Sequence, residues 1–294
     1  MHQPVLLNEV LEYLNPSPGK NFIDCTIGFG GHTLPILEKN KPDGKVLGID
    51  SENKVLEILK EKVSDQANQR LVLAQGNFIN LKKIAAENKF TLINGILLDL
   101  GISSWHFEKS KKGFSFQKNE PLIMNYSGKE LTAEEIVNQW TENELMEIFK
   151  EYGEERYARS IARLICQKRK IELIKTTNQL VEIIKQAVPG KYRHRRIHFA
   201  TKIFQALRIA VNNELDNLEK VLPQALEVLE VNGRLVVISF HSLEDRIVKH
   251  FFRQAAKDGY VNILTKKPIM ASQNEIELNS RSRSAKLRAI EKLR

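Results

Sequence analysis

The residues best placed to do chemistry stand where apolar runs of this sequence end. The run at 21–23 meets Asp24, and the stretch Gly28-Phe29-Gly30-Gly31 follows directly. Glycines expose bare backbone to a ligand and tolerate positive φ angles. Their spacing is not that of the GxxxxGK[ST] phosphate loop. It also departs from GxGxxG, because Thr33 stands where the last glycine would be. The stretch predicts a ligand held by backbone, with a loose dinucleotide loop left open.

Three more candidates follow the next apolar runs. Asp50 ends the second run about twenty residues after the glycines, where a carboxylate can accept hydrogen bonds from both ribose hydroxyls. This combination predicts an adenosine-type cofactor, either NAD or S-adenosylmethionine. Phe78 follows the third run and can pack on an adenine. Asp99 ends the fourth run, where it can face an adenine, a cationic amine or the substrate. Together with the strand-like run NGRLVVISF, these residues favour the methyl donor.

Alternating strand and helix patterns must position these residues. Apolar runs at 22–27, 45–50, 70–77 and 92–101 alternate with amphipathic helical runs, as is typical of a parallel, doubly wound sheet. Ligands of such sheets bind at the carboxyl ends of the strands. Strand chemistry returns at 232–242, and two weaker strands are predicted near VNILT and KLRAIEKL.

Between the fourth and fifth predicted strands the pattern is almost wholly helical. Thr132 and Glu135 form a capping-box pattern near its start, and one continuous helical run is expected from His198 to Glu230. We expect an all-helical domain inserted into one sheet domain. The predicted parts are residues 1–107 and 213–294 for the sheet domain and 108–212 for the insert.

Composition restricts the class of protein. The 294 residues are 42% apolar, enough for one or two folded domains, and no apolar run has the length of a membrane span. The start MHQPVLLNEV lacks the features of a signal peptide, and the two distant cysteines fit neither a disulfide nor a zinc framework. We expect a cytoplasmic protein without membrane association.

Positive charge is concentrated in one segment. Residues 156–208 hold fourteen Lys and Arg against two acids, whereas the whole chain carries +9, so the remainder is about −3. A basic segment on a mildly acidic protein favours a polyanion partner, although a solvated helix surface is an equal alternative.

The histidines suggest little metal or hydrolase chemistry. His194 and His198 are four apart without an HExxH pattern, and SFHSLED has no GxSxG elbow. We expect no metal site. His241 stands at a strand end, where a substrate-side role and a capping role are both open.

Long segments of the chain resemble the bacterial 16S rRNA (cytosine-N4)-methyltransferase family, the MraW type. The resemblance runs nearly end to end, and its segments are long and unusual. They are HQPVLL, GFGGHT, LLDLGISS, GFSF, YGEERYARSIA, FQALRIAVNNEL, GRLVVISFHSLEDRIVK and RSRSAKLRAIE.

The resemblance implies a class I S-adenosylmethionine-dependent methyltransferase, a Rossmann-like doubly wound sheet with an inserted all-helical domain. It implies S-adenosyl-L-methionine as cofactor and assigns site residues by matching position. The cofactor contacts would be Gly30, Gly31, His32, Asp50, Phe78, Asp99 and His106. The chain departs from the family pattern at Ile123, Asn125, Phe199 and Lys202.

The implied activity is methylation of the exocyclic N4 amine of a cytidine in 16S rRNA, at the decoding site of an assembled small ribosomal subunit. Asp99 and His241 are the catalytic candidates, with Ser239 or a backbone carbonyl as alternative acceptors for the amine. The predicted RNA contacts of the basic insert are Arg193, Arg195, Arg196, Lys202 and Arg208. The sequence leaves open a homodimer, and also a non-catalytic assembly factor or an NAD-dependent oxidoreductase.

Overall fold

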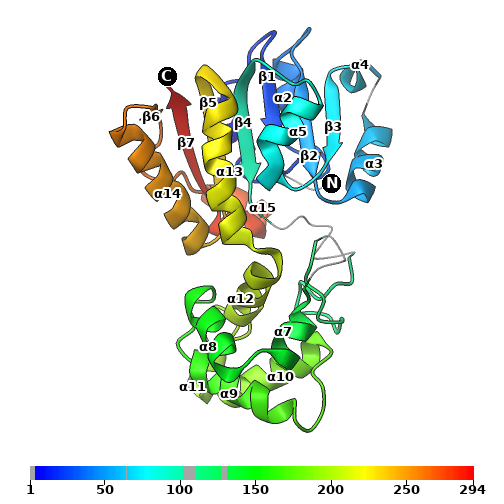
Figure 1. Cartoon of the computed structure of the whole chain (residues 1–294), viewed down its shortest axis with the longest axis vertical. Coiled ribbons are helices and arrows are strands. Elements are labelled where there is room, and N and C mark those ends of the chain that lie inside the picture. The colour runs from blue at the N-terminus through cyan, green and yellow to red at the C-terminus, as the bar shows by residue number, and fades with distance from the viewer. Residues whose placement is uncertain (1–3, 64, 102–109, 127–130) are drawn as a thin grey trace. The chain divides into compact units, whose positions relative to one another are not determined.

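The computed structural model describes residues 4–63, 65–101, 110–126 and 131–294, except for the side chains of residues 65 and 66. The chain divides into two compact units. A sheet unit consists of Met1–Gly101 and Leu215–Arg294, and a helical unit consists of Ile102–Glu214. Figure 1 labels the helices and strands of both units.

The sheet unit is built on seven strands in the order β3-β2-β1-β4-β5-β7-β6. Strands β1 to β5 are parallel to one another, and β7 is antiparallel to both β5 and β6. Their bounds are β1 Asn21–Asp24, β2 Val46–Asp50, β3 Leu71–Gln75, β4 Ile93–Asp99, β5 Leu229–Ser239, β6 Val261–Ile263 and β7 Lys286–Lys292. All seven predicted strands are confirmed. Strands β4 and β5 are neighbours although 129 residues lie between the end of β4 and the start of β5.

Helices cover both faces of this sheet because its strands are apolar on both sides. One buried cluster joins the strands to α5, α13 and α14, and a second joins the other face to α1, α2 and α3 (Figure 1). The helices of the sheet unit are α1 Leu7–Leu14, α2 Thr33–Lys39, α3 Asn53–Lys62, α4 Asp65–Asn68, α5 Leu81–Glu87, α13 Glu214–Val228, α14 Ser242–Lys257 and α15 Gln273–Leu278. Two short 3₁₀ helices, η1 Phe78–Asn80 and η2 Ser280–Ser284, complete it.

The helical unit packs its described helices around a separate core. Fully buried side chains such as Leu145, Phe149 and Ile161 lie at its centre. The helices are α7 Ala133–Gln139, α8 Glu142–Glu151, α9 Ala158–Lys168, α10 Thr177–Ala187, α11 Gly190–Arg193 and α12 Thr201–Asn212. The predicted capping box of Thr132 and Glu135 is confirmed at the start of α7.

One helix prediction is wrong. The run from His198 to Glu230 is broken at Asn213, which adopts the left-handed conformation (φ 50°, ψ 39°) and ends α12. Asn tolerates this conformation better than most residues. No helix of the described residues combines the length and the apolar character needed to cross a bilayer.

Candidate active site

The candidate site lies at the carboxyl ends of β1 and β4. These strands are hydrogen-bonded neighbours, and the strand order reverses between them because β2 and β3 lie on one side and β4 and β5 on the other. Ligands of open parallel sheets bind at such a reversal. Asp24 ends β1 and Asp99 ends β4, so two carboxyl groups stand at this point.

Asp24 holds the turn after β1 together. It is 1% exposed, and its carboxylate accepts hydrogen bonds from Thr33 Oγ1 at 2.6 Å and from the backbone N of Thr26 at 3.1 Å. Burial raises the pKa of Asp24 above its ordinary value, although these hydrogen bonds and His32 oppose the shift. The hydroxyl of Thr26 in turn accepts a hydrogen bond from the backbone N of Asp99 at 2.8 Å. The turn after β1 therefore fixes the end of β4.

Asp99 has an oxygen atom that the described residues leave without a hydrogen bond. Its side chain keeps 23% of its surface exposed, but Oδ1 is inaccessible and unpartnered among the described residues. Burial raises the pKa of Asp99 to about 6, with Asp24 and Glu244 acting in the same direction and His32 and the backbone N–H of Gly101 opposing. Since a buried acceptor is normally satisfied, this oxygen is an exception among the described residues, and a ligand can reach only the exposed part of the carboxyl group.

His32 is buried beside this carboxyl group. Its Nε2 lies 2.9 Å from the carbonyl oxygen of Val5, which can only accept, so Nε2 carries a hydrogen atom. Its Nδ1 lies 3.8 Å from Asp99 Oδ2. The predicted cofactor neighbour His32 thus connects the N-terminal segment to Asp99.

The predicted glycines of the loop differ in their surroundings. Gly30 has a positive φ of 77°, and a Cβ there would lie 2.8 Å from a methyl group of Leu59. A Cβ on Gly31 would lie 3.1 Å from Pro4. The side-chain directions of both residues are therefore filled by protein. Gly28, with φ 50°, has nothing closer than 3.9 Å in that direction, so the open side of the loop is at Gly28.

Asp50 connects the loop to β2. Its Oδ2 accepts from the backbone N of Gly28 at 3.1 Å, and its Oδ1 accepts from the backbone N of Glu52 at 2.9 Å. Both oxygens are held in place at the end of β2. Phe78, the predicted adenine contact, begins η1 just after β3 and is half-buried against the core. The last predicted cofactor residue, His106, lies outside the described residues.

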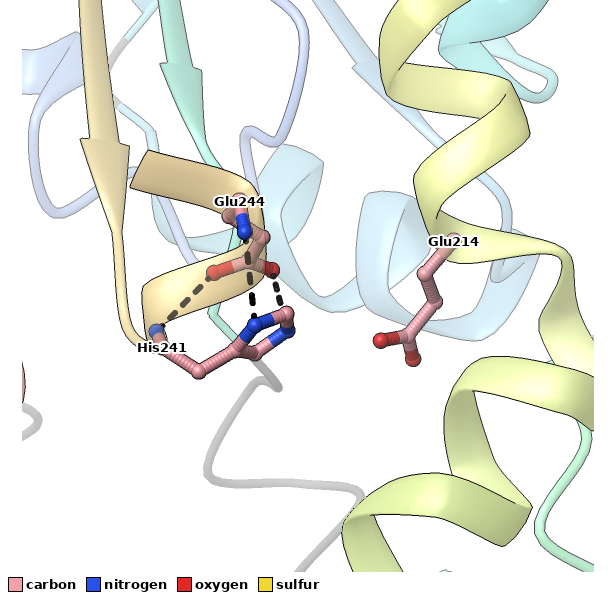
Figure 2. Close-up of side chains that lie close together, drawn as sticks. All are labelled: Glu214, His241 and Glu244. Atoms are coloured by element: carbon pink, nitrogen blue, oxygen red, sulfur yellow. Dashed lines mark hydrogen bonds and ion pairs between the residues drawn. The ribbon is translucent and has the colours of Figure 1, made fainter. Parts of the chain in front are cut away.

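His241 caps α14. Its Nδ1 accepts from the backbone N of Glu244 at 3.4 Å, and the Glu244 carboxylate accepts from the backbone N of His241 at 3.2 Å. Figure 2 shows this reciprocal pair and the approach of Nε2 to Glu244 Oε1, at 3.2 Å and too poorly aligned for a hydrogen bond. The capping alternative for His241 therefore has a structural basis. Nearby Ser239, fully buried at the end of β5, has a hydroxyl without a partner among the described residues.

Three of the predicted RNA contacts lie at or after the short helix α11. Arg195 and Arg196 are exposed, and the guanidinium of Arg195 lies 4.9 Å from the centre of the Tyr192 ring. Arg193 donates to the carbonyl oxygen of Val188 at 3.2 Å. The buried hydroxyl of Tyr192 donates to Glu155 at 2.7 Å, which ties this arginine segment to the core of the helical unit.

The other two predicted RNA contacts bind other parts of the helical unit. Arg208 lies 2.8 Å from the Glu214 carboxylate, and both side chains are less than one-fifth exposed. Lys202 donates to the carbonyl oxygen of Glu154 at 2.6 Å. These contacts favour an internal structural role for Arg208 and leave Arg195 and Arg196 as the exposed cations of the set.

Sequence reasoning missed Thr26, Thr33 and Gly28 as individual residues. A signal was present, because an acid at a strand end followed by Thr two residues later commonly forms a side-chain-to-backbone turn. The hydrogen bond between Thr26 and Asp99 could not be predicted from the local sequence, since the two residues are 73 positions apart.

Comparison with known proteins shows the family of the chain. The model of the MraW methylase family matches residues 1–293. The chain belongs to the MraW methylase family. Curated relatives include the ribosomal RNA small subunit methyltransferase H of Syntrophotalea carbinolica, 46% identical, with 99% of this chain and 98% of the relative covered. The protein of the same name from Pseudothermotoga lettingae is 44% identical, with 99% of each chain covered.

A solved structure supports the fold. A presumed rRNA methylase of Clostridium thermocellum is similar over the full length of both chains, with a TM-score of 0.50 and 12% identity. The predicted class I methyltransferase fold is confirmed by this likeness and by the strand order. The prediction of S-adenosylmethionine as cofactor is supported by membership in a methylase family with this fold. An NAD-dependent oxidoreductase does not fit that family.

Proposed function

We propose that this protein transfers a methyl group from S-adenosylmethionine to the exocyclic N4 amine of a cytidine in small-subunit rRNA. The observation that carries the proposal is the partly exposed carboxyl group of Asp99, with a pKa that burial raises to about 6, at the point where the strand order reverses. The names of the relatives support small-subunit rRNA as the substrate class. Cytosine N4 fits because its amine needs an acceptor for a departing proton.

The residues around β1 and β2 fit the cofactor. We assign Asp50 to the ribose hydroxyls, because its carboxylate is already oriented by the backbone of Gly28 and Glu52. The open side of the loop at Gly28 allows a close backbone approach by a molecule whose amino-acid part carries no phosphate. We assign Phe78, half-buried after β3, to the adenine. When bound, S-adenosylmethionine supplies an electrophilic methyl group on a sulfonium.

Asp99 provides the acceptor for the amine. The lone pair of N4 is delocalised into the cytosine ring, so the nitrogen becomes nucleophilic only as it pyramidalises. A hydrogen bond from N4–H to the partly exposed Asp99 carboxylate orients the amine. S-adenosylmethionine would supply the methyl group, and as N4 took it up Asp99 would accept the N4 proton and pass it to solvent. A carboxyl group with a pKa of about 6 is ionised at neutral pH and accepts this proton readily.

We assign only Asp99 to proton transfer. His241 holds the first turn of α14 through Nδ1, and rotating the ring toward substrate would remove that cap. Ser239 is fully buried, so we assign it no contact with the amine.

The helical unit supplies the RNA contacts in this proposal. Arg195 and Arg196 are exposed within the basic segment, and arginines bind phosphate oxygens well through paired N–H donors. A base within a folded RNA must leave its stack to reach the donor methyl. We further propose that the substrate is a decoding-site cytidine of an assembled subunit, in the cytoplasm where that particle is found.

The test is transfer of tritiated methyl groups to small ribosomal subunits from cells that lack the endogenous enzyme. We expect label in the RNA with the wild-type protein and a rate of labelling roughly 10²- to 10⁴-fold lower with Asp99→Asn. A folded wild-type protein that binds S-adenosylmethionine but labels neither subunits nor naked RNA would favour the non-catalytic assembly factor.

A further inference from the structure

A basic groove lies in the sheet unit, on elements that the proposed active site does not use. It has a volume of about 450 Å³ and runs between α14 and the edge of the sheet at β6. One wall is a single face of α14, where Lys249 and Arg253 stand one turn apart. The other wall is β6 with the residues that follow it, including Lys266. Phe252 and Val261 form a buried apolar floor.

The groove has a large excess of positive charge. Its lining contains Lys249, Arg253, Lys266 and Arg288, and it contains no acid. The charge of Arg288 is neutralised by Asp245, because Arg288 is 8% exposed and donates to the Asp245 carboxylate at 2.6 Å. The other three cations have no carboxylate among the groove's lining residues, so about three positive charges face one groove.

The arrangement of these cations favours a polymeric anion. Lys249 and Arg253 follow the axis of α14 over about 6 Å, and Lys266 faces them from the β6 side. Charges along both walls of an open groove suit a chain of phosphates that passes through it. β6 is also the outermost strand of the sheet, and an edge strand presents backbone N–H groups that can donate to phosphate oxygens.

We propose that this groove binds the phosphodiester backbone of the RNA substrate, at a site separate from the arginines of the helical unit. The inference rests on the proposed function only in taking the bound polyanion to be RNA. It predicts that RNA affinity is shared between the two units, so that the helical unit alone does not account for it.

The test is a charge-reversal variant of the full-length chain, Lys249→Glu with Arg253→Glu and Lys266→Glu. Binding to deproteinised small-subunit rRNA is measured from 50 to 300 mM salt. Neutralising about three phosphate contacts should remove about 2 from the slope of log affinity against log salt, and affinity at about 100 mM salt should fall at least tenfold. The charge-conserving variant Lys249→Arg with Arg253→Lys and Lys266→Arg should keep the wild-type slope.

The matched control reverses three exposed lysines elsewhere on the sheet unit, Lys54, Lys60 and Lys89. It changes net charge equally, so a loss of affinity as large as that of the groove variant would overturn the proposal. An unchanged salt slope in the groove variant would also overturn it. S-adenosylmethionine binding, measured in parallel, should be unaltered and shows that the variant is folded. Because binding is the readout, a protein that bound RNA through the groove but transferred no methyl group would contradict only the proposed function.

Discussion

The carboxyl group of Asp99 determines how the proposed reaction depends on pH. Burial raises its pKa to about 6, and only the ionised form accepts the amine proton. The rate constant kcat should therefore fall about tenfold per pH unit below pH 6 and level off above pH 7.

The same raised pKa affects the stability of the fold. It means that the folded protein binds this proton more tightly than the unfolded chain does. This contribution favours folding below pH 4 and is lost as pH rises through 6.

Replacing Asp99 with Asn tests its role directly. The amide has almost the same shape but cannot accept the proton, so kcat should fall roughly 10²- to 10⁴-fold. The dissociation constant of S-adenosylmethionine, measured by calorimetry, should change much less. A variant whose kcat is intact, or whose acidic limb is unchanged, would remove Asp99 from the chemistry.

Asp50 is predicted to act on cofactor affinity. Asp50→Ala should weaken S-adenosylmethionine binding roughly 10- to 100-fold, because it removes hydrogen bonds to a charged acceptor and also releases the backbone of Gly28. Asp43→Ala, at an exposed acid of the same unit, is the control. Equal affinities for the two variants would contradict the assignment.

Among the helices, α14 offers a test at its first turn, where variants of His241 distinguish a capping role from a catalytic one. His241→Ala should lower the free energy of unfolding by about 1 kcal/mol, because the first turn of α14 loses the acceptor for the Glu244 N–H. His241→Asn keeps an acceptor at the cap, so denaturant unfolding and methyl transfer should both stay close to wild type. A stable His241→Asn protein without activity would restore the catalytic reading.

The first five strands were predictable because each is a mainly apolar run that ends in a polar residue. This pattern located Asp24, Asp50 and Asp99 at strand ends, and parallel pairing brings such ends to one edge. The break at Asn213 was not predictable from periodicity, since the helical pattern continues through it and only the backbone conformation of one residue changes.

Which glycine of the stretch after β1 can face a ligand depends on residues distant in sequence. Leu59 and Pro4 fill the space beside Gly30 and Gly31, and nothing local in the glycine stretch indicates either contact. Likewise, the sequence alone gives Arg208 as one more cation of a basic segment. The structure pairs it with Glu214, which follows the break after α12. Long-range contacts of this kind decide which member of a motif faces a ligand.

For the whole molecule, we expect RNA affinity to depend on charged side chains and therefore on salt. We expect S-adenosylmethionine affinity to depend only on the residues of the cofactor site. Replacing Arg195 and Arg196 with Ala should reduce the salt slope of RNA binding by about 1 to 2 and leave S-adenosylmethionine affinity unchanged. Lys54 and Lys60, exposed on α3, supply the control pair. If both pairs of replacements weakened RNA binding equally, a specific role for the arginine segment would be wrong.

The chemical identity of the product distinguishes N4 methylation of cytidine from methylation at any other atom. Small subunits lacking the endogenous modification would be incubated with the protein and S-adenosylmethionine, and their RNA digested to nucleosides for mass spectrometry. We expect N4-methylated cytidine with the wild-type protein and a yield over the same time roughly 10²-fold or more lower with Asp99→Asn. Methylation on a ring carbon or a ribose hydroxyl, or on a base other than cytosine, would contradict it.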